Sequence, residues 1–490
     1  MPHLFMLSFI TVWIRKKHMA IETKTETKNP LGKEPVGRLM LRFAIPSIIG
    51  MLVAALYNIV DQLFIGNFVG AEGNGATNIA FPFTTACLSI SLLFGIGGAS
   101  CFNLSMGREE RDKAPYFVGN SLTMLVLFGT VIALTAEVFL TPMLKLFGAS
   151  ENILPFAQEY VRVTAIGFPF LMFTTGGCHL VRADGSPQMA MICNITGALI
   201  NTALDALFVI VFDWGMFGAA LATIIGQIIS AVIVFIYILH YKTVRLERKH
   251  FKPQLKYVSQ AAAIGMGSFF NQVAMLVVQI VLNNSLKHYG AASVYGEDIP
   301  LAVAGIVLKV GQIFFSIVIG IAQGTQPIES FNYGAKNYPR VREAYKQAII
   351  ASGAVSVIAF LMFMLIPRQI LSLFGKDNSE QYFDFGASYF RIYFFFICLN
   401  FVQPVTSTFF TSIGKAFKGA FLSLTRQLLF LIPLMLILPK FFGIDGILYS
   451  GPIADFIAIV ATLIMAAFEF KDMKRLETEK VKTDNLYRET

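Results

Sequence analysis

Charged residues are scarce in this sequence of 490 residues, at 14%, whereas a soluble globular protein carries roughly a quarter. Hydrophobic residues make up 55% of the chain, with 47 phenylalanines and 39 glycines against two tryptophans. So few charges cannot cover the surface of a soluble domain of this size, whereas helix contacts within lipid favour small residues such as glycine. The composition therefore excludes an ordinary soluble protein and indicates an all-α protein that crosses a membrane many times.

Cysteine is also scarce, and its distribution excludes two further classes of protein. The five cysteines are odd in number, scattered and mostly inside apolar runs, and no CxxC or Cys/His cluster occurs. Neither a disulfide framework nor a zinc site fits this pattern. The sequence predicts no cofactor, and no metal apart from a candidate Na⁺ discussed below.

The N-terminal residues do not predict a signal peptide. The apolar stretch LFMLSFITVW is followed by its positive charges, whereas a signal peptide has them in front. Met19 is a candidate translation start, so we assign no function to residues 1–18. The net charge of +9 does not predict nucleic-acid binding, because the basic residues lie in short loops between apolar runs.

Twelve apolar segments are long enough to cross a bilayer, which takes about 20 residues. They lie near residues 41–67, 79–106, 117–140, 156–181, 189–212, 217–240, 258–286, 300–331, 344–366, 384–411, 418–438 and 445–470. Basic loops such as GREERDK and HYKTVRLERKHFKPQLK alternate with loops poor in Lys and Arg such as FDWGMF. The positive-inside rule therefore predicts a plasma-membrane protein with both termini, residues 1–36 and 471–490, in the cytoplasm.

The chain repeats itself at a shift near 227–229 residues. The segment MLKLFGASENILPFAQEYVRV resembles ILSLFGKDNSEQYFDFGASYFRI, and Gly107 after the second span matches Gly334 after the eighth. We expect two parallel six-helix halves, residues 37–240 and 258–470, joined by the basic cytoplasmic linker 241–257. Substrate is expected between such halves, which rock to expose it to either side. The alternative is an old duplication retained only for stability.

Two carboxylates lie inside the apolar spans of the N-terminal half. Asp61 and Asp205 are each about six or seven residues from the predicted outer end of their spans, a depth of ~9 Å at 1.5 Å per residue. Thr223 shares this depth, and Asn201 and Tyr57 each lie one turn below an acid on the same helix face. A charge within a span is costly and usually faces a cavity or a partner.

Such a group of oxygens suits one of two uses. Two carboxylates, an amide and hydroxyls can surround Na⁺, or the acids can share a proton, since close like charges raise one pKa. The alternative is a hydrogen-bonded knot that only joins helices. At the repeat-shifted positions Asp61 falls near Val281 and Asp205 near Pro433, so only the N-terminal half carries these acids.

The C-terminal half carries other polar groups. Arg426 and Asp455 both fall near mid-membrane, and we expect a structural ion pair. The roles of Lys309 and Glu329 stay open. A candidate substrate path, or alternatively a set of helix-joining amides, consists of Gln279, Gln312, Gln323, Gln326, Asn400 and Gln403.

The chain resembles the multidrug and toxic compound extrusion family over essentially all of residues 37–470. The resemblance is carried by AIPSIIGMLVAALYNIVDQLFIG, NTALDALF and GIAQGTQPIESFNYGA, the last typical of a bacterial branch. It implies a V-shaped, two-lobed antiporter that exports cationic or amphipathic drugs as Na⁺ or H⁺ enters. The ion site of that family's N-terminal lobe maps onto Tyr57, Asp61, Asn201, Asp205 and Thr223.

The resemblance also implies a hinge in the first span, and this chain departs from another branch of the family in its C-terminal half. The proline linked to bending of the first span maps onto Pro46. Another branch uses acids in spans seven and ten, where this chain has Gln272 and Gln279 and no acid beyond Asp384 at the edge. A second ion site in the C-terminal half is therefore not expected.

Three rival functions remain. A lipid-linked oligosaccharide flippase of the same superfamily would have a strongly cationic cavity, whereas Lys309 and Arg426 are the cations that the spans suggest. A major-facilitator carrier would show a glycine-and-basic motif between spans two and three, where this chain has SMGREERDK. A membrane prenyltransferase would need aspartate-rich metal motifs. We expect a monomeric transporter in the bilayer, not an enzyme, whose partners are small molecules.

Overall fold

The computed structural model describes residues 29–296, 298–374 and 379–489, and these fold into helices without a β-strand. The suggested start at Met19 lies outside the described residues. Eleven helices are long and apolar enough to span a membrane, and a bent pair with an angle of 42° brings the number to twelve. The prediction of an all-α, multi-spanning protein is confirmed.

The N-terminal half contains six spans, each close to its predicted limits. They are α3 (Val36–Phe68), α4 (Ala71–Gly107), α5 (Ala114–Val138), α7 (Leu154–Ala183), α8 (Pro187–Asp205) with its π-helical continuation η1 (Ala206–Val211), and α9 (Gly215–Leu239). Short helices precede and interrupt them: α2 (Pro30–Lys33) and α6 (Leu140–Leu146). The segment that follows α9 includes a 3-10 turn, η2 (Arg248–Phe251).

The C-terminal half repeats this order. Its first three spans are α10 (Leu255–Ala291), α11 (Asp298–Gly334) and α12 (Tyr338–Leu365), and its last is α20 (Ile444–Glu489). The fourth span is bent and consists of α14 (Glu380–Tyr393), α15 (Ile397–Asn400) and α16 (Val402–Ser412). The fifth consists of α17 (Ala416–Leu424), η3 (Thr425–Leu431), α18 (Ile432–Ile437) and α19 (Pro439–Phe442). The short α13 (Pro367–Ser372) follows α12 as α6 follows α5. A π-helical turn interrupts the fifth span of both halves, as η1 and as η3.

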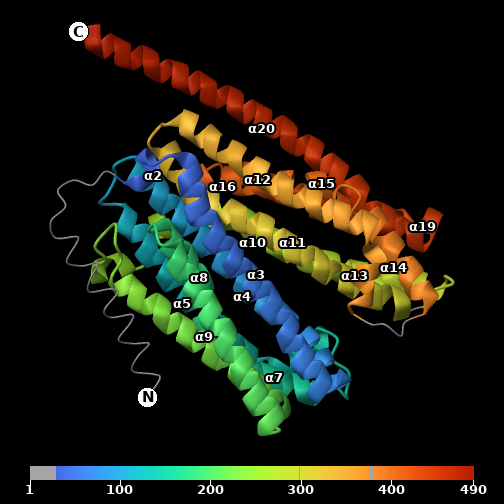
Figure 1. Ribbon diagram of the computed structural model, residues 1–490. Coiled ribbons are helices and arrows are strands. Elements are labelled where there is room, and N and C mark those ends of the chain that lie inside the picture. The colour runs from blue at the N-terminus through green and yellow to red at the C-terminus, as the bar shows by residue number, and fades with distance from the viewer. Residues whose placement is uncertain (1–28, 297, 375–378, 490) are drawn as a thin grey trace.

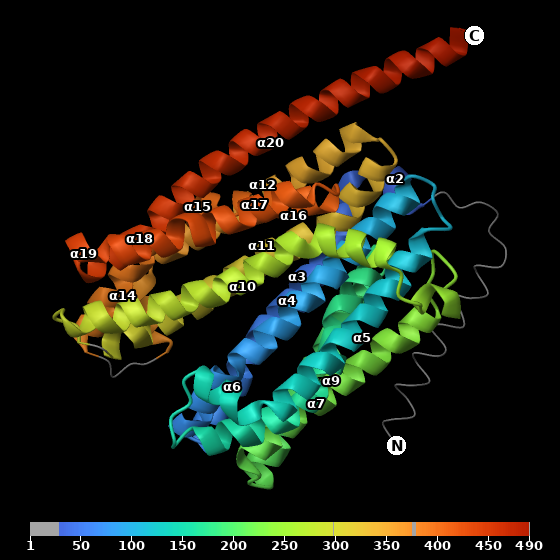
Figure 2. The same cartoon turned by 180° about the vertical axis from the view of Figure 1, so that it is seen from behind.

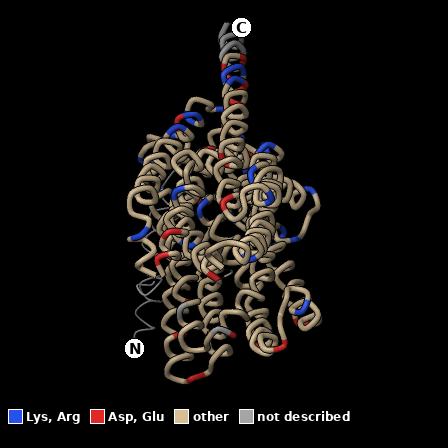
Figure 3. The backbone as a smooth tube through the Cα atoms, turned by 90° about the vertical axis from the view of Figure 1, so that its right-hand side faces the viewer, with Lys and Arg blue, Asp and Glu red and all other residues tan. Residues whose placement is uncertain are grey.

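The two halves form separate bundles whose axes diverge, so that the molecule has the shape of a V (Figures 1 and 2). We call the end where the bundles meet the basic end; it carries the loops that the sequence predicts to be cytoplasmic, at residues 108–113, 184–186, 240–254, 335–337 and 413–415. The far end carries α6, α13 and α19. Figure 3 shows the Lys and Arg residues mainly on loops and on the C-terminal helix, while the bundle interior is largely uncharged.

Glycines allow the two halves to touch at the basic end. Helix α4 packs against α10, and there Gly97 lies against the backbone carbonyl of Ala261 while Gly265 lies against that of Leu93. A Cβ on either glycine would overlap these backbone atoms. The matching contact in the repeat is that of α11 with α3, where Gly320 lies against the backbone of Ile48 and Gly324 against that of Ala44.

A reciprocal pair of contacts follows nearer the basic end. Gly107 lies against the carbonyl of Phe331, and Gly334, its match in the repeat, lies against the carbonyl of Leu104. Close backbone approach through small residues is the usual way in which helices associate in lipid, where no hydrophobic effect drives them together. These contacts all lie in the halves of their helices that face the basic end, which is why the bundles are free to diverge at the far end.

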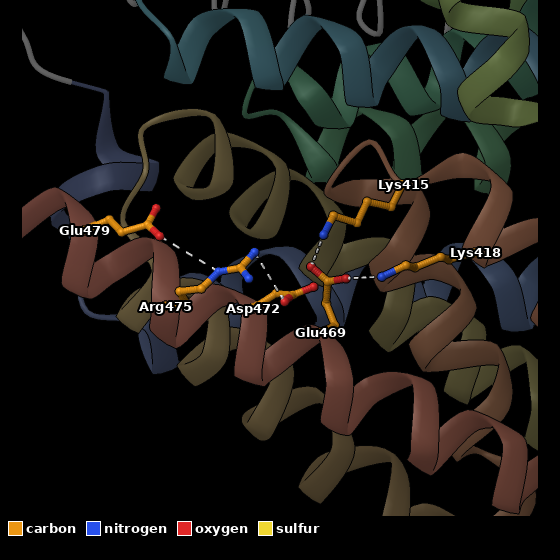
Figure 4. A network of polar contacts seen from close by, with 6 residues as sticks. All are labelled: Lys415, Lys418, Glu469, Asp472, Arg475 and Glu479. Atoms are coloured by element: carbon orange, nitrogen blue, oxygen red, sulfur yellow. Dashed lines mark hydrogen bonds and ion pairs between the residues drawn. The ribbon is translucent and has the colours of Figure 1, made fainter.

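The end of the chain differs from the prediction. The last span was expected to stop at residue 470 before a tail, whereas α20 continues as one helix to Glu489 and projects beyond the bundle (Figure 1). Arg475 lies 3.7 Å from Asp472 and 3.9 Å from Glu479, at the i,i+3 and i,i+4 spacings that stabilise exposed helices (Figure 4). Glu477 adds a 2.7 Å ion pair to Arg342 of α12.

Helix α20 is also fixed at the basic end by a buried carboxylate. Glu469 is fully buried, and its two oxygens lie 2.5 Å from Lys415 Nζ and 2.8 Å from Lys418 Nζ (Figure 4). Both lysines belong to the turn between α16 and α17 and the first residues of α17. This interaction holds that turn against α20.

We predict that Gly97→Ala lowers the stability of the protein, because the new methyl group meets a backbone carbonyl that cannot move alone. Overpacking of this kind costs about 1–3 kcal/mol. The matched control is Gly305→Ala on α11, where a Cβ meets open space. The thermal unfolding midpoint in detergent should fall for Gly97→Ala and stay equal or rise for Gly305→Ala, and equal midpoints would disprove the tight contact.

Candidate functional site

The five residues predicted to form an ion site come from three helices of the N-terminal half. Helix α3 carries Tyr57 and Asp61, α8 carries Asn201 and Asp205, and α9 carries Thr223. The spacing of four residues on α3 and on α8 places each pair on one helix face. Helices α3, α8 and α9 pack against one another, and the structure brings all five side chains together inside the bundle.

The centre of this group is a pair of carboxyl groups. Asp61 is 9% exposed and Asp205 1%, and the two carboxyl groups lie close enough to interact electrostatically. Oδ1 of Asp61 and both carboxyl oxygens of Asp205 are buried without a hydrogen-bond partner in the described part of the chain. Nor does any ion pair among the described residues involve either acid. Two buried acids without a basic partner need a proton or a bound cation, because an isolated buried carboxylate is very costly.

An amide and a hydroxyl complete the polar group. Asn201 Nδ2 donates to Thr223 Oγ1 at 3.2 Å, and Thr223 Oγ1 donates to the carbonyl of Ala219 at 3.0 Å. These bonds fix the Asn201 side chain, and its Oδ1 is buried without a partner in the described structure. Carboxylate, amide and hydroxyl oxygens are ligands that hard cations accept. Among the described residues no group of three or more His, Cys, Asp or Glu could hold a metal ion.

Sequence reasoning missed Tyr160 of α7 as a member of this group. Tyr160 is near enough to both acids and to Tyr57 to interact electrostatically with them, and its hydroxyl interacts with Thr223. The sequence contained one indication that Tyr160 is important, because it recurs as Tyr389 in the repeat. The site is thus enclosed from four helices.

The backbone at the site is also irregular. The π-helical turn η1 begins at Ala206, directly after Asp205. Single π-helical turns inside α-helices are frequent at functional sites, since they widen the helix and leave backbone carbonyls less regularly bonded. Nothing in the amino-acid pattern of this span marks the turn.

The candidate hinge lies in α3, between the acid site and the basic end. Pro46 is buried in the middle of a continuous helix and lacks the N–H that would bond to the carbonyl of Arg42. It lines a small cavity with Ser47, Gly50 and Arg182. A helix can bend at such a point, and the hinge role of Pro46 stays a prediction.

The six amides proposed as a substrate path lie in three different settings, and their role in transport stays a prediction. Asn400 Nδ2 donates to Asp455 at 3.1 Å and Gln403 Nε2 donates to the carbonyl of Leu422 at 2.9 Å, so both join helices within the C-terminal half. Gln279 and Gln312 are exposed. The remaining two, Gln323 and Gln326, lie between the halves.

These two glutamines form polar contacts across the junction at the basic end. Gln323 accepts a hydrogen bond from the buried guanidinium of Arg182, at the end of α7. Gln326 Nε2 donates to Ser100 Oγ of α4 at 2.8 Å. Arg182 was not recognised in the sequence, because it is the last basic residue before a predicted loop and resembles an ordinary loop charge.

The predicted ion pair of the C-terminal half is present. Arg426 Nε lies 2.5 Å from Asp455 Oδ1, and the two side chains are 14% and 1% exposed. Of the two residues left open, Glu329 is buried and adjoins Ser412, and Lys309 is half-buried. Within the C-terminal half, Asp455 is therefore neutralised by Arg426 of the same half.

We predict that Asp455→Ala destabilises the protein by about 3–5 kcal/mol, because it leaves the Arg426 guanidinium buried without its carboxylate. The double change Arg426→Met with Asp455→Leu should recover most of this loss, since replacing both partners with apolar groups is often neutral. Unfolding midpoints of the single and double variants measure this. A double variant as unstable as the single one would show that the pair itself is not the reason.

Known proteins resemble this chain along almost its whole length. A sequence model of the MatE family matches residues 46–207 and 267–437. The multidrug export protein MepA of Staphylococcus aureus (strain MRSA252) is 24% identical over 450 residues, covering 92% of this chain and 97% of that protein. The MepA of Staphylococcus haemolyticus is 24% identical over 419 residues, covering 85% and 90%.

Solved structures show the same fold. An outward-facing multidrug resistance MATE family transporter of the MOP superfamily has a TM-score of 0.85 at 22% identity, with 92% of this chain and 100% of that one covered. A MOP superfamily transporter from Pyrococcus furiosus, described as having a binding pocket of reverse polarity, has a TM-score of 0.84 at 23% identity and the same coverage.

Proposed function

This chain belongs to the MatE family of membrane transporters, and from that premise we propose that it is a secondary active antiporter. It exports cationic or amphipathic small molecules while H⁺ or Na⁺ moves inward. Membership makes the chain a transporter and not an enzyme. The names of its relatives, multidrug export proteins, support the substrate class. The chain works as a monomer in the plasma membrane with both termini in the cytoplasm.

The observation that carries the proposal is the unpaired couple of buried acids, Asp61 and Asp205. With no base beside them, their free energy depends on whether a cation is bound, and a gradient of that cation can therefore do work on the protein. Arg426 removes this dependence from Asp455, because that acid already has its counter-ion. We therefore place the coupling at Asp61 and Asp205 in the N-terminal half.

Ion occupancy acts on α3, which links the acid site to the junction between the halves. Asp61 and Tyr57 lie on the far part of α3, Pro46 interrupts its hydrogen bonds, and its basic-end part packs against α11. When H⁺ or Na⁺ neutralises the two acids, α3 bends about Pro46 and fills space between the halves, which favours release of the bound drug. Rocking about the glycine contacts at the basic end then returns the empty carrier.

We predict that Asp205→Asn abolishes export while the protein stays folded in the membrane, because it removes one of the two carboxylates that would hold the coupling cation. Ethidium accumulation in cells that express the protein measures export. Wild type should lower accumulation, and Asp205→Asn should raise it to the level of cells without the protein. Asp213→Asn, an exposed change of the same kind eight residues away, is the matched control and should export normally. Equal accumulation with and without wild-type protein would refute drug efflux.

The coupling ion is determined in proteoliposomes that are driven by one gradient at a time. We expect a Na⁺ gradient or a pH gradient, inward and without the other, to drive export by wild type, and neither to drive Asp205→Asn. The donor set of two carboxylates, one amide and hydroxyls fits both ions. If neither gradient drives the wild type, antiport is wrong.

A further inference from the structure

A cavity of about 420 Å³ lies at the basic end, away from the two acids. The N-terminal half contributes the end of α4, the loop 108–113 and the start of α5, and the C-terminal half contributes the start of α10 and the turn before α17. Pockets of roughly 300–1,000 Å³ are typical of small-molecule sites. The cavity is therefore large enough for a ligand that touches both halves at once.

The polar side of this cavity is cationic. Arg108, Lys113 and Lys256 line it with a single acid, Glu110, which is already bound to Lys113 at 3.0 Å. In the described structure no ion pair involves Arg108 or Lys256. Arg108 and Lys256 are both exposed and both line the cavity. Two basic groups from opposite halves, without carboxylate partners, favour an anion between them.

The other side of the cavity is apolar. The rings of Phe117 and Tyr257, one from each half, meet edge to face at 5.1 Å, and Leu104, Ile264 and Ile413 continue the wall. A small inorganic anion would leave this wall in contact with water. A phosphate group that carries an apolar chain uses both sides.

We propose that this cavity binds the headgroup and the adjoining apolar part of an anionic phospholipid. The phosphate lies between Arg108 and Lys256, and the glycerol and first chain carbons pack on Phe117 and Tyr257. The basic end is predicted to face the cytoplasmic leaflet, where anionic lipids attract basic residues. Bound there, the lipid holds the two halves together at the end where they already meet.

The wall of the C-terminal half is held firmly enough to serve this purpose. Ile413 and Gly414 line the cavity immediately before Lys415, whose ammonium group is bound to the buried Glu469 of α20 (Figure 4). The turn is therefore fixed on its outer side. This inference concerns a second site and does not depend on which ion drives export.

The test measures the thermal unfolding midpoint of the purified protein in a neutral detergent. Short-chain phosphatidylglycerol, short-chain phosphatidylcholine and inorganic phosphate are titrated separately, and a ligand of the folded state raises the midpoint. We expect phosphatidylglycerol to act at concentrations at least about tenfold lower than phosphatidylcholine, a factor that one charge-assisted contact accounts for. Equal potency of the two lipids, or of inorganic phosphate and phosphatidylglycerol, would overturn the proposal.

Variants locate the site. Arg108→Ala and Lys256→Ala should each raise the half-effective concentration of phosphatidylglycerol roughly tenfold. The matched control is Arg111→Ala, an exposed residue of the same loop that does not line the cavity. A similar loss in Arg111→Ala would mean general surface attraction and would overturn the site.

A further variant covers the case in which loss of a charge weakens the fold. Ala263→Leu narrows the cavity and leaves the net charge unchanged. It should abolish the preference for phosphatidylglycerol while the midpoint without lipid stays near that of wild type. An unchanged preference would place the lipid elsewhere and contradict the proposal.

Discussion

The structure depends on the cost of keeping two carboxyl groups inside a membrane bundle without a base. Asp61 and Asp205 cannot both stay charged and unpaired in surroundings of low dielectric constant, and the proposed coupling rests on the difference in free energy between their occupied and unoccupied forms. The hydrogen-bond donors of Asn201 and Thr223 are directed to other partners and leave the two acids unpaired. Because α3 carries one of the acids and also packs against the opposite half, a local change in charge reaches the junction through a single helix.

The junction between the two halves needs a geometry that stays constant while the charge of the acid site changes. Glycines at the crossing of α4 and α10 bring backbones into contact, and contacts between backbones cannot slide as long side chains can. Two side-chain hydrogen bonds also join the halves, from Arg182 to Gln323 and from Gln326 to Ser100. They fix the position of one half along the other and can break. In the rocking motion that we propose, the backbone contacts form the axis. The side-chain hydrogen bonds are the contacts that break, because they can open without unfolding a helix.

Much of this was predictable from the sequence, for physical reasons. Apolar length gives the spans, and counting residues from predicted span ends placed Asp61, Asp205 and Thr223 at one depth, because helical rise is constant. That counting says nothing about rotation around a helix axis. Asn400 and Gln403 therefore seemed equivalent to Gln323, although they join helices within one half. The π-helical turn after Asp205 and the inward direction of Arg182 arise from tertiary packing, which residue types alone do not encode.

The two halves compensate the charge of their mid-membrane acids in different ways, and this difference makes them unequal. Tyr160 and Tyr389 match in the repeat, and π-helical turns interrupt the fifth span of both halves, so the two bundles share a framework. In the N-terminal half Asp61 and Asp205 have no basic partner, whereas in the C-terminal half Asp455 is paired with Arg426. Under the proposed mechanism the paired acid keeps one charge state, whereas the two unpaired acids change theirs when a cation binds. The duplication produced two similar bundles. In the proposed mechanism, the bundle that contains the Arg426–Asp455 pair stays fixed and the other bundle moves against it.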